Sequence, residues 1–137
     1  MVDFEAQFPS APSAVRAARR AARAFARRSG FGQWDVSDIV LAVGEACNNA
    51  VEHGHVTGGQ FTMRCHCDDG GDVAFEIEDR GGGFELGTKG GAIAPSERGV
   101  RGLGIFLMRC LMDDVHYDAT EFGTIVRLVK RAHPAPM

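Results

Sequence analysis

The segment LAVGEACNNAVEHG, residues 41–54, constrains this chain more than any other stretch. At helical spacing it has an apolar side, made of Leu41, Val43, Cys47, Ala50 and Val51. Glu45, Asn49 and His53 recur every four residues, so they stack on a different side of the same helix. An amphipathic helix with a polar edge would explain the pattern. A carboxylate, a carboxamide and an imidazole grouped on a core helix also favour a functional site.

Length and composition indicate a globular protein with a real core. The chain has 137 residues, of which 45% are hydrophobic and 24% are charged. No apolar run approaches the roughly 18 residues that a membrane span needs, and the N-terminus has no hydrophobic signal segment. The four cysteines lack the spacing of a disulfide framework. We therefore expect reduced thiols, a cytoplasmic location and no membrane contact.

The charge is unevenly distributed along the chain. Residues 1–30 contain six Arg and two acidic residues, whereas the remainder contains nine basic and sixteen acidic residues. Four arginines form one stripe at helical spacing, namely Arg16, Arg20, Arg23 and Arg27. A solvated face is the simplest explanation of this stripe, and a docking face for an acidic protein surface is the alternative. Direct nucleic-acid binding is disfavoured, because no aromatic residues interleave with the arginines.

The pattern of periodic segments and turns predicts an α+β fold. A strand is expected over residues 2–8, then a helix capped by Ser13 that runs to Arg28 and stops at Gly30. The central helix should begin at Asp35 or Ser37. The remaining elements are strands 60–67 and 72–78, helix 102–112, and strands 115–119 and 124–130.

Most of these connections are hairpins, so the sheet should be mostly antiparallel. We expect a single domain over residues 1–137: a two-layer α/β sandwich with the helices on one face and a frayed tail from about residue 131.

Several apolar residues and cysteines are assigned to packing. The inward side of helix 102–112 is expected to consist of Leu103, Phe106, Leu107, Cys110 and Leu111. Met108 and Met112 are also interpreted as packing residues. The C-x-C at residues 65–67 places two thiols on one strand face without a second ligand pair, which favours strand packing over a zinc site.

Two glycine-rich segments add to the pattern of the central helix. Residues 81–83 are all glycine and follow a strand that ends in Asp79, whose carboxylate can accept a hydrogen bond from an exocyclic amine such as that of adenine. Gly99, Gly102 and Gly104 precede or open a helix, whose free N–H groups attract phosphate. Each signal alone is weak, and neither matches a Walker or dinucleotide-binding pattern.

Three segments, taken in order, resemble the N box and the two glycine boxes of the GHKL ATPases. They are E-A-C-N-N-A-V-E-H-G, D-R-G-G-G-F and G-V-R-G-L-G-I-F-L-M. That superfamily includes histidine kinases, gyrase-type ATPases and Hsp90. The run R-G-L-G-I-F-L-M-R-C-L-M-D-D-V and the closing F-G-T-I-V-R-L-V-K look most like its anti-sigma-factor serine kinase branch. The resemblance covers residues 4–130 and implies the GHKL (Bergerat) fold.

The resemblance implies a role for each matched residue. Asn49 corresponds to the asparagine that coordinates Mg²⁺, Glu45 to the general base, and Asp79 to the adenine-binding aspartate, supported by Gly81 and Gly83. The other matched positions lie near the phosphates or, for the last, near the base: Asn48, His53, Gly102, Leu103, Gly104 and Thr124. Residues 84–101 would form the ATP lid, from which Arg98 or Arg101 could reach the γ-phosphate. Phe84 departs from the family pattern, in which an aliphatic residue is commoner.

The function implied is that of an ATP- and Mg²⁺-dependent protein serine/threonine kinase. By resemblance, its substrate would be a STAS-domain anti-sigma antagonist, and it could also hold a sigma factor inactive and form a homodimer. One alternative is an ATP-gated binding module without phosphotransfer. A histidine kinase catalytic domain fits less well, because no phosphoacceptor helix hairpin precedes the central helix. Excision from a larger protein stays open.

Overall fold

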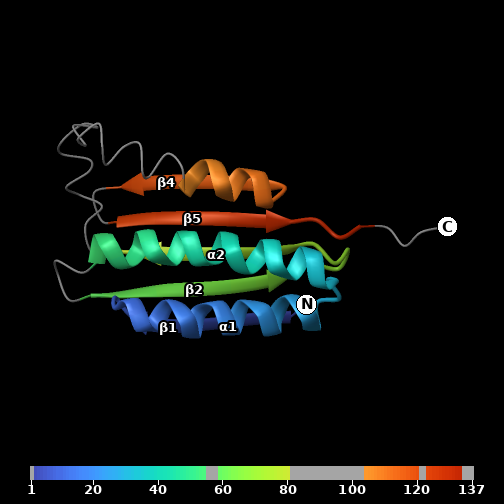
Figure 1. Ribbon diagram of the computed structural model, residues 1–137, viewed down its shortest axis with the longest axis horizontal. Helices are drawn as coiled ribbons and strands as arrows, with labels where there is room; N and C mark the ends of the chain where they lie inside the picture. Colours follow the sequence, from blue (N-terminus) through green and yellow to red (C-terminus); the bar gives the residue numbers. More distant parts are fainter. Residues whose placement is uncertain (1, 55–58, 81–103, 121–122, 134–137) are drawn as a thin grey trace.

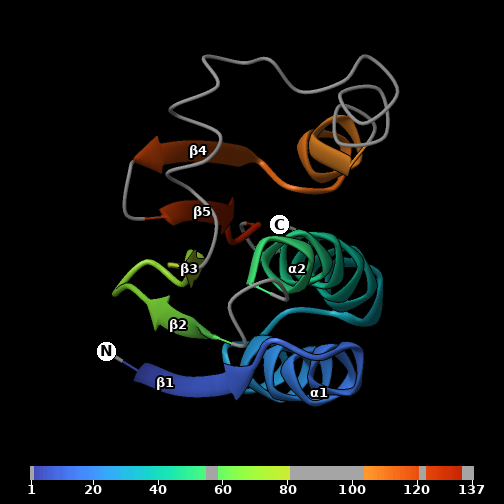
Figure 2. The ribbon, with the colours of Figure 1, turned by 90° about the vertical axis from the view of Figure 1, so that its left-hand side faces the viewer.

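The computed structural model describes residues 2–54, 59–80, 104–120 and 123–133. In these residues the chain forms two layers, a five-stranded sheet and a layer of helices that covers one face of it (Figures 1 and 2). This architecture confirms the expected α+β two-layer sandwich. No described helix is both long and apolar enough to cross a membrane.

The sheet is antiparallel throughout, with the strand order β1-β2-β3-β5-β4. Its strands are β1 (Val2–Pro9), β2 (Gln60–Cys67), β3 (Val73–Asp79), β4 (Asp114–Thr120) and β5 (Gly123–Lys130). The Asp68 side chain stabilises the turn between β2 and β3, since it accepts hydrogen bonds from the backbone N–H groups of Gly70 and Asp72. β5 pairs with β3 on one side and with β4 on the other, so the last strand of the chain lies inside the sheet and β4 forms its edge.

Two long helices pack side by side on this sheet, α1 (Pro12–Arg28) and α2 (Gln33–Gly54). Ser13 does not cap α1, because the N-cap is Ala11 and Pro12 occupies the first turn, where its missing N–H costs nothing. Gly30 follows the end of α1 with φ of +98°, as expected of the residue that stops it. α2 begins at Gln33, two residues before the earlier of the two starts predicted for it.

The hydrophobic core lies between the helices and the sheet. Phe25 of α1 meets Phe75 of β3 edge to face, with ring centroids 5.9 Å apart. Cys65 and Cys67 both point into this core, as strand packing requires. Burial raises the pKa of the Cys65 thiol to about 12.

Four apolar side chains predicted to face inwards are instead exposed. On α2, Leu41 is 51% exposed, because the side of the helix that meets the core is the one bearing Val36, Val40 and Val43. Residues 104–111 form the third helix, on which Phe106, Leu107 and Cys110 face outwards.

The reason is that apolar side chains occur all around this short segment, in which Arg109 is the one charged residue, and Met108 and Met112 turn towards the core in their place. Leu111 is half-buried and packs on the core as expected.

Candidate functional site

The second half of α2 brings two polar side chains against helix 104–111. Glu45 and Asn49 are half-buried and lie one turn apart. A Cβ at Gly104 would lie 3.3 Å from Oε2 of Glu45 and 3.9 Å from Nδ2 of Asn49. The Gly104 backbone therefore lies beside both groups, and a side chain at this position would crowd the carboxylate of Glu45 while only touching the carboxamide of Asn49.

A second polar group lies where β3 ends and β5 begins. Asp79, the last residue of β3, is 1% exposed, and Thr124 is 4% exposed and pairs with it across the two strands. Gly123 precedes Thr124 with φ of +148°, and a Cβ there would overlap the backbone of Asp79 and Arg80. Only glycine fits this approach, so Gly123 sets how closely Thr124 is held to Asp79.

Both groups lie towards the same end of the molecule. α2 ends at Gly54, β2 begins shortly afterwards at Gln60, and Asp79 pairs with the next residue, Phe61. α2 also packs on β3 and β5. This is the end that faces the viewer in Figure 2. The candidate site is therefore bounded by α2, the start of helix 104–111, and the adjoining ends of β3 and β5.

The chemistry of these groups suits a hard cation and a nucleotide. Glu45 and Asn49 have side-chain oxygen atoms, which are the ligands that Mg²⁺ prefers. Gly104 leaves free the space beside them that a side chain would fill. Within the described residues, no group of three or more His, Cys, Asp or Glu side chains is placed to bind a metal ion. An ion at Asn49 would thus need ligands from elsewhere, such as phosphate oxygens and water, as the family resemblance implies.

The structure brings five of the predicted site residues to this end: Glu45, Asn49, Gly104, Asp79 and Thr124. Asn48 is exposed on α2, about 100° around the helix from Asn49. Six predicted site residues lie outside the described residues: Gly81, Gly83, Arg98, Arg101, Gly102 and Leu103. His53 lies in α2, but its side chain is not among those described. The individual roles of all these residues stay predictions.

One contributor to the site escaped the sequence analysis. Gly123 falls between the predicted strands 115–119 and 124–130 and has no predicted role; its position directly before Thr124 is the signal that could have identified it. Cys47, by contrast, lies on α2 close to Glu45 but takes no part. Its thiol is buried in the core, and burial raises its pKa to about 12, which leaves it protonated and unreactive near neutral pH.

Comparison with known proteins gives consistent results. The family model described as the histidine kinase-like ATPase domain matches residues 8–130. The chain is similar to the serine-protein kinase RsbW of Listeria innocua, with 33% identity over 123 residues, which cover 82% of this chain and 78% of the relative. It is also similar to the serine-protein kinase RsbW of Bacillus licheniformis, with 32% identity over 137 residues, covering 93% and 84% of the two chains.

A solved structure shows the same fold. The crystal structure of the RsbU and RsbW domains of Rv1364c from Mycobacterium tuberculosis superposes with a TM-score of 0.75 at 23% sequence identity. The match covers 98% of this chain and 34% of that chain, so this chain spans about a third of the longer protein.

Proposed function

Because the chain belongs to the family of histidine kinase-like ATPase domains, we propose that it is an ATP- and Mg²⁺-dependent protein serine/threonine kinase of the anti-sigma type. The family membership confirms the resemblance to GHKL ATPases drawn from the sequence. The observation that carries the proposal is the placement of Glu45 and Asn49, one turn apart, against the backbone of Gly104. The names of the two RsbW relatives support the choice of a protein serine kinase.

Phosphoryl transfer depends mainly on positioning and on the stabilisation of charge. Glu45 would accept the proton of the incoming hydroxyl as the bond to the γ-phosphorus forms and the bond to the leaving ADP oxygen breaks. The carboxamide oxygen of Asn49 would hold Mg²⁺. When bound, Mg²⁺ neutralises negative charge on the triphosphate. The bare backbone of Gly104 would let the phosphates approach both side chains.

The other matched residues would bind and orient the nucleotide. Asp79 would accept a hydrogen bond from the exocyclic amine of adenine, with Thr124 beside it. Their burial is consistent with this role. A carboxylate shielded from water binds a ligand that donates a hydrogen bond to it much more tightly than a ligand that lacks the donor. Around the phosphates and the lid we place the remaining matched residues: Asn48, His53, Gly81, Gly83, Arg98, Arg101, Gly102 and Leu103.

The protein substrate would be a STAS-domain anti-sigma antagonist, phosphorylated on a serine or threonine hydroxyl. Binding of a sigma factor would then alternate with binding of the unphosphorylated antagonist. Both assignments are supported by the anti-sigma branch that the sequence resembles and by the relatives named RsbW.

The test uses the purified chain with Mg²⁺, γ-labelled ATP and each STAS-domain protein of the same organism. We expect one of them to acquire phosphoserine or phosphothreonine, identified by mass spectrometry. Glu45→Gln should lower the rate by about 100-fold or more, since a general base contributes roughly that much. Calorimetry should show that this variant binds ATP within a few-fold of the wild-type affinity. Asp69→Asn, in the exposed turn between β2 and β3, is the matched control and should keep full activity.

The alternative function, an ATP-gated binding module, predicts a different outcome. A partner that is retained with Mg-ATP and released with Mg-ADP, but that never gains phosphate, would contradict the kinase proposal. Equal phosphotransfer by Glu45→Gln and the wild type would remove Glu45 from the mechanism.

A further inference from the structure

The single tryptophan of this chain is exposed. Trp34 lies in the first turn of α2 and is 79% exposed, and Leu41, seven residues later, is 51% exposed. Positions seven apart share one side of a helix, so the two side chains form an apolar strip on the outer side of α2. A large aromatic side chain left in solvent is informative, because burial of such a group usually contributes to stability.

A hollow of about 460 Å³ adjoins Trp34, between the end of α1 and the start of α2. Its lining consists of Arg23, Arg27, Gln33, Trp34, Val36 and Ser37. We call this hollow the Trp34 groove. It combines one indole ring, two guanidinium groups and a few small or polar side chains, with room for an anchor side chain from outside.

The positive charge beside the groove lacks an ion-pair partner among the residues that the structure describes. The four arginines of the α1 stripe, Arg16, Arg20, Arg23 and Arg27, are all exposed, and α1 contains no acidic residue. No ion pair joins any of the four to a carboxylate within the described part of the chain.

The acidic residues at the start of α2 do not supply that balance. Asp35 and Asp38 face Lys130 instead, at 3.8 and 3.7 Å from its Nζ, and Nε2 of His133 lies 3.5 Å from Asp35. Among the described residues, therefore, no carboxylate pairs with the arginines of the groove, which leaves them available to an acidic partner.

We propose that the Trp34 groove docks an acidic segment of a partner protein that places an aromatic or aliphatic anchor residue against Trp34. Tryptophan and arginine are the residues most enriched among the energetic centres of protein interfaces. The guanidinium groups of Arg23 and Arg27 would pair with carboxylates that flank the anchor, a geometry for which arginine is well suited.

The groove is separate from the candidate nucleotide site. Eleven positions separate Trp34 from Glu45 along α2, which is about 16 Å at the helical rise. The inference therefore uses none of the residues of the proposed phosphotransfer and does not rest on it. A protein segment is a better occupant than nucleic acid, because residues outside the first thirty carry sixteen acidic against nine basic side chains and would repel a long polyanion.

The single tryptophan makes the groove directly observable, since all tryptophan emission comes from this site. A phage-displayed library of random 12-residue peptides would be selected on the intact chain, and the enriched peptides synthesised. We expect these peptides to combine Asp or Glu with an aromatic or aliphatic residue. Their binding should shift Trp34 emission to the blue, because the ring is buried. Their affinity should fall as the salt concentration rises. The double variant R23E/R27E should weaken binding at least tenfold, and Trp34→Ala should do the same in a calorimetric titration.

A control with the same change in charge separates the groove from net charge. R109E/R131E alters two exposed arginines that do not line the groove, and its affinity should stay within twofold of wild type. Circular dichroism would verify folding, and R23Q/R27Q would replace the charge reversal if that variant does not fold. Four results would each overturn the proposal. The selected peptides could lack acidic residues or leave Trp34 emission unchanged. The two charge variants could lose peptide affinity equally, or a single-stranded oligonucleotide could bind more tightly than the peptides.

Discussion

At the scale of single residues, Gly104 allows a direct test of the geometry around Glu45. Gly104→Ala adds a methyl group 3.3 Å from Oε2 of Glu45, a distance at which the carboxylate must shift. Gly104 begins the described part of its helix, and alanine has a higher helix propensity than glycine, so the fold should not suffer. We expect phosphotransfer to fall about tenfold or more while the midpoint of thermal unfolding is unchanged or higher, because catalysis is sensitive to small misplacements.

Gly32→Ala is the matched control, since nothing lies within 4 Å of a Cβ at that position. It should leave the phosphotransfer rate unchanged. Full activity of Gly104→Ala would show that the close approach of Gly104 to Glu45 is only a packing feature.

Gly123, which holds Thr124 close to Asp79, is also expected to affect the stability of the fold. Gly123→Ala would require a φ of +148° from a residue with a side chain and would overlap the backbone of Asp79 and Arg80. We expect a loss of more than about 2 kcal/mol in the free energy of unfolding, measured by urea denaturation. Gly70→Ala, where a Cβ would only touch Oδ1 of Asp68 at 3.4 Å, should change it far less. Similar values for the two variants would refute this account of Gly123.

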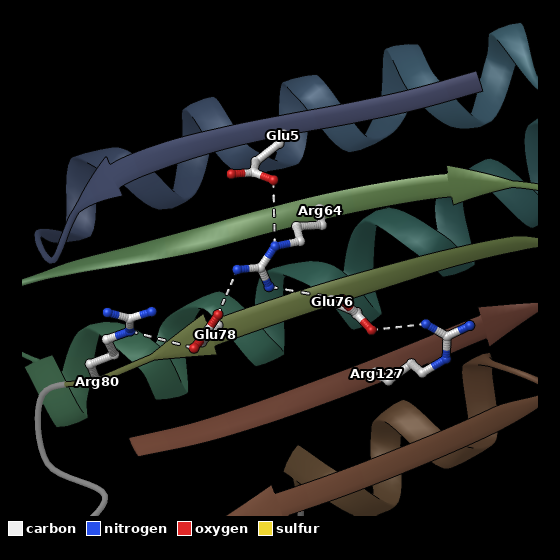
Figure 3. A network of polar contacts seen from close by, with 6 residues as sticks. All are labelled: Glu5, Arg64, Glu76, Glu78, Arg80 and Arg127. Atoms are coloured by element: carbon white, nitrogen blue, oxygen red, sulfur yellow. Dashed lines mark hydrogen bonds and ion pairs between the residues drawn. The ribbon is translucent and has the colours of Figure 1, made fainter. Parts of the chain in front are cut away.

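At the scale of elements, the outer face of the sheet is held by an ordered row of charges. Strand register places Glu5, Arg64, Glu76 and Arg127 opposite one another across four strands. Figure 3 shows Arg64 at the centre of this network, with its Nη2 donating to Oε1 of Glu78 at 2.7 Å. That hydrogen bond lowers the pKa of the Glu78 carboxyl, and the positive charges of Arg64 and Arg80 act in the same direction.

This network predicts a pH dependence of stability. The Glu78 pKa is lower in the folded chain than its unfolded value of about 4.3, so its ionised form stabilises the fold above that pH. The contribution is lost as pH falls through the folded pKa. Urea denaturation between pH 7 and pH 3 should therefore show a gap between wild type and Glu78→Gln that narrows as pH falls. The exposed-turn control, Asp69→Asn, should show no comparable narrowing. A constant gap for Glu78→Gln would rule out the ionised carboxylate as the source.

Most elements of this fold could be predicted from periodicity and turn residues, because alternation and helical spacing report which side chains share a side. Those signals do not report which side meets the core. Helix 104–111 has apolar side chains all around its axis, so the sheet beneath it decides that Met108 turns inwards while Phe106 and Leu107 do not. The wrong assignment of Leu41 has the same origin.

The candidate site, too, could be predicted only in part from the sequence. Spacing alone predicts that Glu45 and Asn49 share one side of a helix. It does not bring Gly104 to them, because that contact joins segments more than fifty residues apart and depends on how the third helix crosses the sheet. Only the family resemblance linked them. The Trp34 groove could not be predicted either, since it forms where α1 and α2 pack together.

At the scale of the whole molecule, α2 connects two distinct ends. Its 22 residues span about 33 Å, with the Trp34 groove at the beginning and Glu45 and Asn49 in the second half. As a single rigid element, α2 can therefore position a partner docked at the Trp34 groove relative to Glu45 and Asn49. The arrangement depends on the start of α2 being fixed to the sheet.

Lys130 supplies that fixed point. Its side chain is 9% exposed, and its Nζ donates a hydrogen bond of 2.6 Å to the carbonyl oxygen of Leu111, beside Asp35 and Asp38. It thus joins β5, the end of helix 104–111 and the start of α2. Lys130→Met retains most of the apolar stem and removes the charge, which leaves a carbonyl and two carboxylates without their cation. We expect a loss of about 1–3 kcal/mol in the free energy of unfolding in urea.

Two further variants separate this role from a general effect of charge. Arg131→Met removes the neighbouring exposed cation and should change stability by less than about 0.5 kcal/mol. Asp38→Asn added to Lys130→Met should recover part of the loss, because one of the stranded carboxylates is then neutral. If the double variant is no more stable than Lys130→Met, and Arg131→Met is equally destabilised, Lys130 does not tie α2 to the sheet. The start of α2 must then be held by apolar packing alone, through side chains such as Val36 and Ile39.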